Sequence, residues 1–208
     1  MQCKLVLCEG KHDRCFIEEL LSGEKIYYTN EMKKFLELVR SFAERENIAL
    51  ILECGGKEGL YKKVGDLVSK LRGSPFNAIL MLDQDGGDTF SKLKRRMEEF
   101  INTPCKFHPQ KPILEEKKNA TLALSLKNYF SNIFVAEVPE SLESVVAKKL
   151  REKLGPSTSG PHDLISSAAK QQLLKGVENE CDIFKLAASD GWFRTESWFR
   201  RLSKLLSK

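Results

Sequence analysis

Short apolar runs alternate with longer amphipathic stretches along the first half of the chain. An apolar run of strand length that ends at a turn is typical of a strand buried on both faces. Such runs cover residues 2–8, 49–54 and 78–82. Apolar residues at helical spacing fill residues 13–21, 30–45, 59–71 and 88–102. Strands and helices in alternation predict a parallel sheet with crossover helices.

The pattern changes in the second half. One short extended piece is expected within residues 104–116, and strands at 121–126 and 133–138 form a hairpin that either extends the sheet or joins its edge. Pro139 and Glu140 mark the start of a helix that reaches about residue 154. Glycine, proline and serine then predict a linker at residues 155–161, with a helical extension over 162–208. The first domain is therefore expected to span residues 1–154.

Aromatic residues and cations alternate in the last segment. Two interpretations stay open: a platform on which single-stranded bases stack, or, more commonly, a helix packed on the domain with its charges in water. The aromatic residues are Trp192, Phe193, Trp198 and Phe199, and the cations include Arg194, Arg200, Arg201 and Lys204.

Composition excludes the disordered classes, because 41% of the 208 residues are hydrophobic and 30% are charged. The net charge of +5 permits a polyanionic partner without requiring one. No apolar run approaches the roughly 18 residues that a membrane span needs, so we expect a cytoplasmic protein with no membrane partner. The six cysteines include no CxxC pair, and we expect them to be reduced, with neither a zinc site nor a disulfide framework.

Acidic residues follow two of the predicted strands. Asp83 and Asp85 share one face of a strand, about 6–7 Å apart, and two glycines after them allow a tight turn. Glu9 directly follows the first strand and has no local capping partner. Ligands of open α/β sheets bind beyond the carboxyl ends of the strands. The alternative for Asp83 and Asp85 is an ordinary acidic turn.

If the first strand and the strand at 78–82 are neighbours, Glu9, Asp83 and Asp85 converge. At about 4 Å two carboxylates repel by roughly 4 kcal/mol even at an effective dielectric constant of about 20. A divalent cation removes that cost, and a site of oxygen ligands with open positions suits Mg²⁺. The chemistry that uses such a site is phosphoryl transfer on a nucleic acid or nucleotide.

Other candidates have plain structural alternatives. Asp13 lies near a helix N-terminus, where it either caps the helix or joins the acids, and Glu143 lies in a first helical turn, where a carboxylate offsets the helix dipole. Gly55 and Gly56 suggest either a phosphate loop or a tight turn, and the GxxxxGK[ST] spacing is absent from the sequence. Lys57 is positioned to meet a nucleic-acid phosphate.

Three motifs in order resemble the Toprim domain of topoisomerases, bacterial primases, RecR-type repair proteins and OLD-family nucleases. They are Glu9-Gly10-Lys11, Gly55-Gly56 and the run from Asp83 through Asp85 to Gly87, within residues 1–145. The resemblance implies a Rossmann-like Toprim fold in which Glu9 is the general acid/base or a metal ligand and Asp83 and Asp85 hold Mg²⁺. Lys11 of the first motif joins the catalytic candidates.

The chain is most similar to the OLD-like branch and to small stand-alone Toprim proteins. That likeness implies further metal ligands at Asp13 and Glu143, and a catalytic lysine for which Lys170 is the best positional candidate. The chain departs from the family in lacking a P-loop ATPase domain, a zinc-binding cysteine set and a marked nucleophilic tyrosine.

The first hypothesis is therefore a nuclease or phosphodiesterase that depends on Mg²⁺, or on Mn²⁺, and acts on DNA or RNA. A separate ATPase or repair protein is a candidate partner. The second hypothesis is a nucleic-acid-binding or adaptor module without turnover, and the third is a domain whose acids only cap helices and turns.

Overall fold

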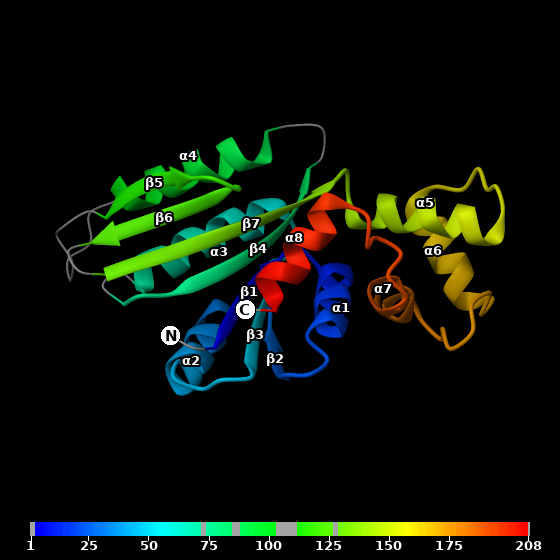
Figure 1. Ribbon diagram of the computed structural model, residues 1–208, viewed down its shortest axis with the longest axis horizontal. Helices are drawn as coiled ribbons and strands as arrows, with labels where there is room; N and C mark the ends of the chain where they lie inside the picture. The colour runs from blue at the N-terminus through cyan, green and yellow to red at the C-terminus, as the bar shows by residue number, and fades with distance from the viewer. Residues whose placement is uncertain (1–2, 72–73, 85–87, 103–111, 127–128, 208) are drawn as a thin grey trace.

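Seven strands form one mixed sheet in the computed structural model, which describes residues 3–71, 74–84, 88–102, 112–126 and 129–207 (Figure 1). The order across the sheet is β2-β3-β1-β4-β7-β6-β5. The strands are β1 (Lys4–Cys8), β2 (Lys25–Thr29), β3 (Ile48–Glu53), β4 (Asn77–Gln84), β5 (Ile113–Lys117), β6 (Thr121–Leu126) and β7 (Tyr129–Pro139). The helices are α1 (Lys11–Leu20), α2 (Met32–Phe42), α3 (Lys57–Lys70), α4 (Thr89–Asn102), α5 (Leu142–Leu154), α6 (Pro161–Lys170), α7 (Glu180–Ser189) and α8 (Ser197–Leu206).

The predicted α/β class with a mainly parallel sheet is confirmed. Each neighbouring pair among β2, β3, β1, β4 and β7 is parallel. β6 and β5 continue the sheet in antiparallel pairing beyond β7. The arrangement is a Rossmann-like α/β fold, in which the central strands are buried on both faces and so read as continuous apolar runs.

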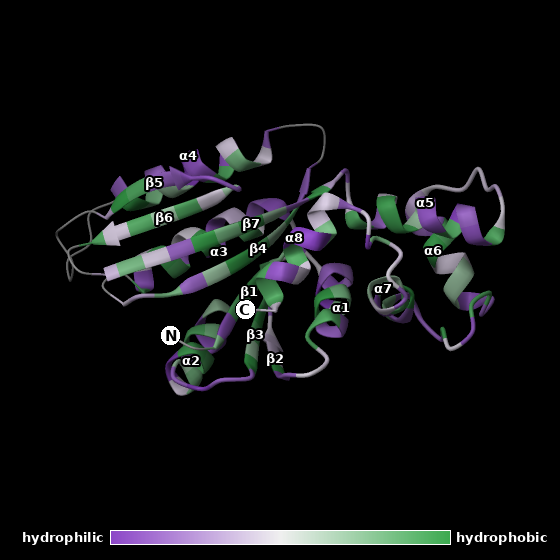
Figure 2. Ribbon diagram, in the orientation of Figure 1, coloured by the Kyte–Doolittle hydropathy of each residue, from purple (hydrophilic) through white to green (hydrophobic). Residues whose placement is uncertain are grey.

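Alternate residues of the central strands enter two separate cores. Leu5 and Leu7 of β1 face the core built with α2, α3 and α4, whereas Val6 and Cys8 face the core built with α1 and α5 to α8. Figure 2 shows the central strands as mostly hydrophobic and the helices as mixed, as expected for elements buried on both faces and on one face respectively.

The two ends of the sheet differ from the sequence prediction. No strand is predicted between the helical stretches 13–21 and 30–45, yet Lys25–Thr29 forms the edge strand β2. β7 begins at Tyr129 and not at residue 133, so the hairpin of β6 and β7 is longer than predicted. The helix predicted from residue 30 starts slightly later, because α2 begins after Glu31, whose backbone N–H donates to Thr29 Oγ1 at 3.1 Å.

The C-terminal helices share one core with the sheet: α8 packs on β7 and β4, α7 packs along α1, and α6 packs against α5. The rings of Phe193, Trp198 and Phe199 lie with their centroids 6.0, 6.0 and 5.9 Å from that of Phe16 on α1. All three are buried, so they serve as core residues and leave no platform for stacked bases in this cluster. Among the residues described, no helix is both long and apolar enough to cross a membrane.

Candidate functional site

The carboxyl ends of β1 and β4 bring Glu9 and Asp83 together. β1 and β4 pair in parallel, with Leu7 opposite Leu80, so both chains leave the sheet at the same edge. The backbone N–H of Asp83 donates to Glu9 Oε1 at 2.9 Å. The expected convergence of these two residues is therefore present, and it arises from strand adjacency and a direct contact. Asp85 lies outside the described residues.

Asp13 lies at the start of α1 and is buried, with 5% of its surface exposed. Its Oδ2 accepts a hydrogen bond from the backbone N–H of Gly10 at 2.9 Å, so the expected capping role is present. Burial first, and then the negative charge of Asp83, raise the pKa of Asp13 well above its ordinary value; the charges of Glu143 and Glu9 act in the same direction. A capping carboxylate thus also belongs to a group of acids.

Glu143 reaches the same edge from the first turn of α5. The helix is positioned by Asp83, whose Oδ1 accepts a hydrogen bond from the backbone N–H of Leu142 at 3.1 Å. The structure thereby gathers four of the predicted acids, which come from the ends of β1 and β4 and from the starts of α1 and α5.

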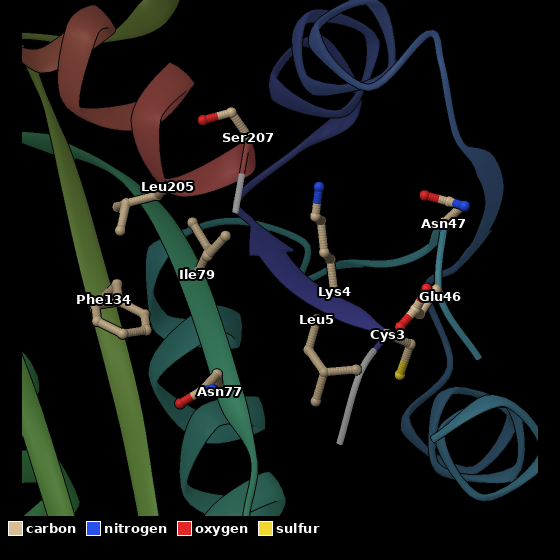
Figure 3. Close-up of a pocket in the computed structure, with 10 residues that line it drawn as sticks. All are labelled: Cys3, Lys4, Leu5, Glu46, Asn47, Asn77, Ile79, Phe134, Leu205 and Ser207. Carbon is tan, nitrogen blue, oxygen red and sulfur yellow. The ribbon is translucent and has the colours of Figure 1, made fainter. Parts of the chain in front are cut away.

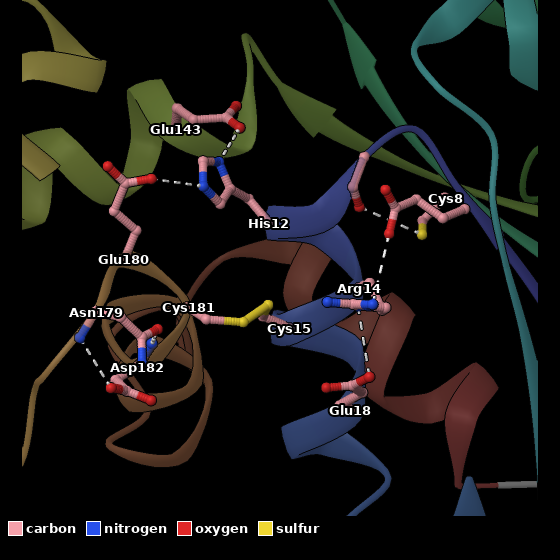
Figure 4. Close-up of a disulfide and its surroundings, with 12 residues drawn as sticks. Cys8, His12, Arg14, Cys15, Glu18, Glu143, Asn179, Glu180, Cys181 and Asp182 are labelled. Carbon is pink, nitrogen blue, oxygen red and sulfur yellow. Dashed lines mark hydrogen bonds and ion pairs between the residues drawn. A yellow bond between two sulfur atoms is a disulfide. The ribbon is translucent and has the colours of Figure 1, made fainter. Parts of the chain in front are cut away.

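His12 was missed by sequence reasoning, although it lies between two predicted residues, Lys11 and Asp13. Its Nδ1 lies 2.8 Å from Glu143 Oε1, and its Nε2 lies 3.3 Å from Glu180 Oε2 on α7 (Figure 4). The ring also stacks on Phe184, with centroids 4.4 Å apart. His12 therefore joins α1 to both α5 and α7. A lone histidine beside an acidic motif is a weak signal, because its partners lie more than a hundred residues away.

The His12 contacts change the protonation of both partners. The hydrogen bond to Glu143 raises the pKa of His12 above its ordinary value, against the opposing effect of burial. Burial alone would raise the pKa of Glu143, but the hydrogen bond and charge of His12 and a backbone hydrogen bond outweigh it and lower that pKa. The pair therefore favours an imidazolium beside a carboxylate.

The glycine pair lies against the Glu9 loop. Gly55 and Gly56 have φ angles of 77° and 94°, a backbone region that residues with a side chain rarely adopt. The backbone N–H of Gly56 donates to the carbonyl oxygen of Glu9 at 2.7 Å. The tight-turn interpretation accounts for both glycines, and the turn brings the start of α3, with Lys57, next to the acidic edge.

Two further predicted lysines lie on helices of the same half of the molecule. Lys11 is the first residue of α1 and is exposed, and its charge contributes to lowering the pKa of Glu180, after a hydrogen bond from Ser166 and the effects of His12. Lys170 is the last residue of α6 and is exposed. No contact links Lys170 to the acids among the residues that the structure describes.

The acids do not form a ready-made metal cage. Within residues 3–71, 74–84, 88–102, 112–126 and 129–207, no group of three His, Cys, Asp or Glu side chains is arranged to hold a metal ion. Glu9, Asp13 and Asp83 each use one carboxylate oxygen to accept a backbone N–H. Several of these side chains would have to turn before they could share a cation.

One prediction about the cysteines is wrong. Cys15 of α1 and Cys181 of α7 form a disulfide, with 5.5 Å between their Cα atoms (Figure 4). The two positions are 166 residues apart and meet only because α7 packs along α1. Cys3, Cys8 and Cys54 are free and buried, as expected, and Cys105 lies outside the described residues.

A separate cavity of about 550 Å³ opens at the other end of the strands (Figure 3). Lys4 and Leu5 at the start of β1 line it, together with Asn77 at the start of β4. The Nζ atom of Lys4 is occupied by Glu24 and by the carbonyl oxygen of Leu206. The cavity therefore lies at the amino ends of the strands, away from the acids.

Comparison with family models, curated proteins and solved structures found no match to this chain.

Proposed function

We propose that this chain is a Toprim-like nuclease or related phosphodiesterase that depends on Mg²⁺ or Mn²⁺ and acts on nucleic acid. The observation that carries the proposal is the gathering of Glu9, Asp13 and Asp83, with Glu143, at the carboxyl ends of β1 and β4. Ligands of parallel α/β sheets bind at that edge. A cytoplasmic location and a separate ATPase or repair protein as partner belong to the same proposal.

The chemistry of these residues suits a hard divalent cation. All four are carboxylates, and Mg²⁺ and Mn²⁺ prefer oxygen ligands. The pKa of Asp13 is raised first by burial and then by the negative charge of Asp83, and a cation bound beside these carboxylates would act in the opposite direction. Glu9, Asp13, Asp83 and Glu143 would hold the cation, which would supply polarisation of a phosphodiester oxygen.

The protein's own groups would then orient the substrate and handle its protons. Glu9 is the candidate general acid/base, because its carboxylate is fixed at the sheet edge by the Asp83 N–H. Lys57 at the start of α3 and Lys11 at the start of α1 would attract the phosphodiester. His12 is a positioning residue that holds Glu143 through a 2.8 Å contact.

A binding or adaptor module without turnover is the rival, and one observation favours it. Glu9, Asp13 and Asp83 each accept a backbone N–H, so each has a use in the fold even if no metal binds. A module that relies on lysine and arginine would bind nucleic acid equally well in EDTA, with a steep dependence on salt. Cleavage, by contrast, would require the cation.

The deciding experiment is a cleavage assay on end-labelled single-stranded and duplex DNA and RNA, with Mg²⁺, Mn²⁺ or EDTA. Glu9→Gln and Asp83→Asn keep an oxygen for their backbone donors while removing charge. Each is expected to lower the cleavage rate by about a hundredfold or more. Glu37→Gln, at an exposed position on α2, is the matched control and should cut as wild type does. Full activity in both site variants would refute the nuclease.

A further inference from the structure

One face of the sheet is left open where β7, β6 and β5 extend beyond the helices. Phe130 of β7 pairs with Ser125 of β6, which pairs with Ile113 of β5. Residues paired directly across a sheet lie on the same face. Phe130 and Ile113, on strands separated by β6, are 66% and 63% exposed, which is unusual for two large apolar side chains on one face of a sheet. The opposite face of these strands is buried, with Leu124 and Ile133 in the core under α3 and α4.

A hollow of about 480 Å³ lies between this open face and α8. Its sheet side includes Thr121 and Phe134, and its helix side includes Arg200, Arg201 and Lys204. Phe134 is four residues beyond Phe130 on β7, so the two rings lie on the same face about 13 Å apart along the strand. An aromatic strip on the sheet therefore runs beside a row of cations on the helix. In Figure 1 α8 lies beside β7, and β6 and β5 extend the sheet beyond the part that α8 covers.

Of the three cations of α8 that line the hollow, one is hydrogen-bonded to the strands and two are exposed. Arg201 Nε donates to the carbonyl oxygen of Val135 at 2.6 Å, and its guanidinium also bonds the carbonyl oxygens of Asn119 and Ala120. Arg201 thereby fixes α8 onto the strands. Arg200 and Lys204 are exposed, and no ion pair joins either side chain to another residue in the described ranges.

The spacing of Arg200 and Lys204 is itself unfavourable. They are four residues apart on one helix, an arrangement in which like charges repel by a few tenths of a kcal/mol. Lys117 adds a third exposed cation on the open face, since it pairs with Thr121, which pairs with Phe134. Glu115, two residues before Lys117 on β5, is the opposing charge on that face. A bound polyanion would therefore be more stable beside β7 and α8 than beside β5.

We propose that this surface, formed by Phe130, Phe134, Arg200 and Lys204, binds single-stranded nucleic acid. Bases would stack on the two rings, and phosphates would lie along the two cations. A second copy of this chain is a poorer occupant, because it would bring two sets of cations together. Duplex is also poorer, since its bases are already stacked on each other. The inference rests on the proposed function only in taking the polyanion to be nucleic acid.

The surface ends before the acidic edge. β7 continues from Phe134 to Val138, and Val138 pairs with Asp83. On the face that carries Phe134, however, Ala136 and Val138 are fully buried in the core beneath the helices. A nucleic-acid strand bound on Phe130 and Phe134 would therefore leave β7 at Phe134, and the surface is a binding region separate from the carboxylates.

The experiment is a titration of a fluorescein-labelled oligodeoxythymidine with the full chain in EDTA, followed by fluorescence anisotropy at several salt concentrations. Phe130→Ala is expected to weaken binding about fivefold or more, the effect of losing one stacked base. Tyr129→Ala, at the preceding residue and on the opposite face of the same strand, is the matched control and should bind as wild type does.

The charged half of the surface has its own test. Arg200→Ala/Lys204→Ala should reduce the slope of the logarithm of the binding constant against the logarithm of the salt concentration by about 1.4 in magnitude. Each phosphate contact on a single strand contributes about 0.7 to that slope. Lys34→Ala/Arg40→Ala removes the same charge from exposed positions on α2 and should leave the slope unchanged. Phe130→Ala should also leave the slope unchanged.

Two results would overturn the inference. One is an affinity for the oligonucleotide that Phe130→Ala leaves unchanged, or that Phe130→Ala and Tyr129→Ala lower equally. The other is self-association of the wild type in sedimentation equilibrium that Phe130→Ala abolishes, which would make the surface a contact between copies. Neither result bears on cleavage. Glu9→Gln and Asp83→Asn should still bind the oligonucleotide in EDTA, so failure of the nuclease and failure of this surface are separable.

Discussion

Glu9 Oε1 accepts a hydrogen bond from the backbone N–H of Asp83, with 2.9 Å between the two atoms. The contact joins the loop after β1 to the end of β4, two segments that are more than seventy residues apart. Parallel pairing of β1 and β4 places the two residues at the same edge, and the side chain of Glu9 then makes the direct contact. The Asp83 carboxylate in turn accepts the N–H of Leu142, so α5 is attached to the same point.

A divalent cation should stabilise the folded chain through this edge. At a concentration of about a hundred times its dissociation constant, Mg²⁺ would add about 2.7 kcal/mol, which raises the melting temperature by about 5–10 °C. Glu9→Gln/Asp83→Asn should lose that rise while keeping both hydrogen bonds. Differential scanning calorimetry with and without Mg²⁺ measures the effect. Glu115→Gln/Glu116→Gln on β5 is the control for charge, and an equal rise in the site variant would exclude these residues as ligands.

Asp13→Asn should make the metal-free protein more stable at neutral pH. The amide oxygen can still accept the Gly10 N–H, whereas the buried charge near Asp83 is removed. Each unit by which the folded pKa exceeds the unfolded one corresponds to about 1.4 kcal/mol, or about 3–6 °C in melting temperature.

The pH dependence of this effect follows from the sign of the shift. The folded pKa of Asp13 is raised, so the advantage of Asp13→Asn should vanish below the ordinary value of 3.8 and grow as pH rises through the folded pKa. Melting curves from acid to neutral pH measure it. Asp163→Asn, exposed in the first turn of α6, should show no such gain. A destabilised Asp13→Asn protein at neutral pH would contradict the assignment of net repulsion.

His12 and Glu143 should stabilise the fold most between pH 4.5 and 6.5, the ordinary pKa values of the two groups. The pKa of His12 is raised, so its contribution is complete below 6.5 and is lost as pH rises through the folded pKa. The pKa of Glu143 is lowered, so its contribution is present above 4.5 and is lost as pH falls through the folded pKa. His12→Asn should therefore be least stable, relative to wild type, inside that window.

The measurement is the midpoint of urea unfolding as a function of pH for wild type and His12→Asn. His162→Asn on α6 is the comparison: its ring centroid lies 6.4 Å from that of His12 and its charge adds to the lowering of the Glu143 pKa, after the effects of His12, so its change should follow the same pH window and be smaller. A constant difference between wild type and His12→Asn at every pH would assign the histidine a packing role against Phe184 alone.

Reduction of the disulfide should lower stability. In the chain-entropy account, a disulfide that closes a loop of 166 residues stabilises the folded state by about 5 kcal/mol. Measured stabilisation by disulfides is commonly about 2–4 kcal/mol. Dithiothreitol should then lower the melting temperature of wild type by about 5–15 °C. Cys15→Ala/Cys181→Ala should not respond to the reductant, and neither protein would respond if the two thiols were never joined.

Much of the fold could be predicted from local pattern. β1, β3 and β4 lie between two layers of helices, so burial on both faces leaves continuous apolar runs in the sequence. β2 was harder, because at the sheet edge its Tyr28 is 55% exposed and Lys25 is also in solvent. The start of β7 was missed for the same reason, since Tyr129 and Phe130 are exposed and adjacent to each other.

The contacts of the candidate site were likewise predictable only in part. The meeting of Glu9 and Asp83 could be expected because residues that follow neighbouring parallel strands leave the sheet at one edge. The contacts of His12 with Glu180 and of Cys15 with Cys181 could not, because both depend on α7 packing against α1 from the far end of the chain. No local periodicity records which helices will be neighbours.

By itself the sequence determined the alternation of strands and helices, the parallel class of the sheet and the acids at its carboxyl edge, since burial and backbone geometry act over a few residues. Only the tertiary structure decided that Asp13 is buried among those acids, that His12 links three helices and that Phe130 is left exposed on the sheet face whose Phe134 lies beside Arg200 and Lys204. These features depend on the order of strands and on helix packing, where contacts form between residues that are distant in the chain.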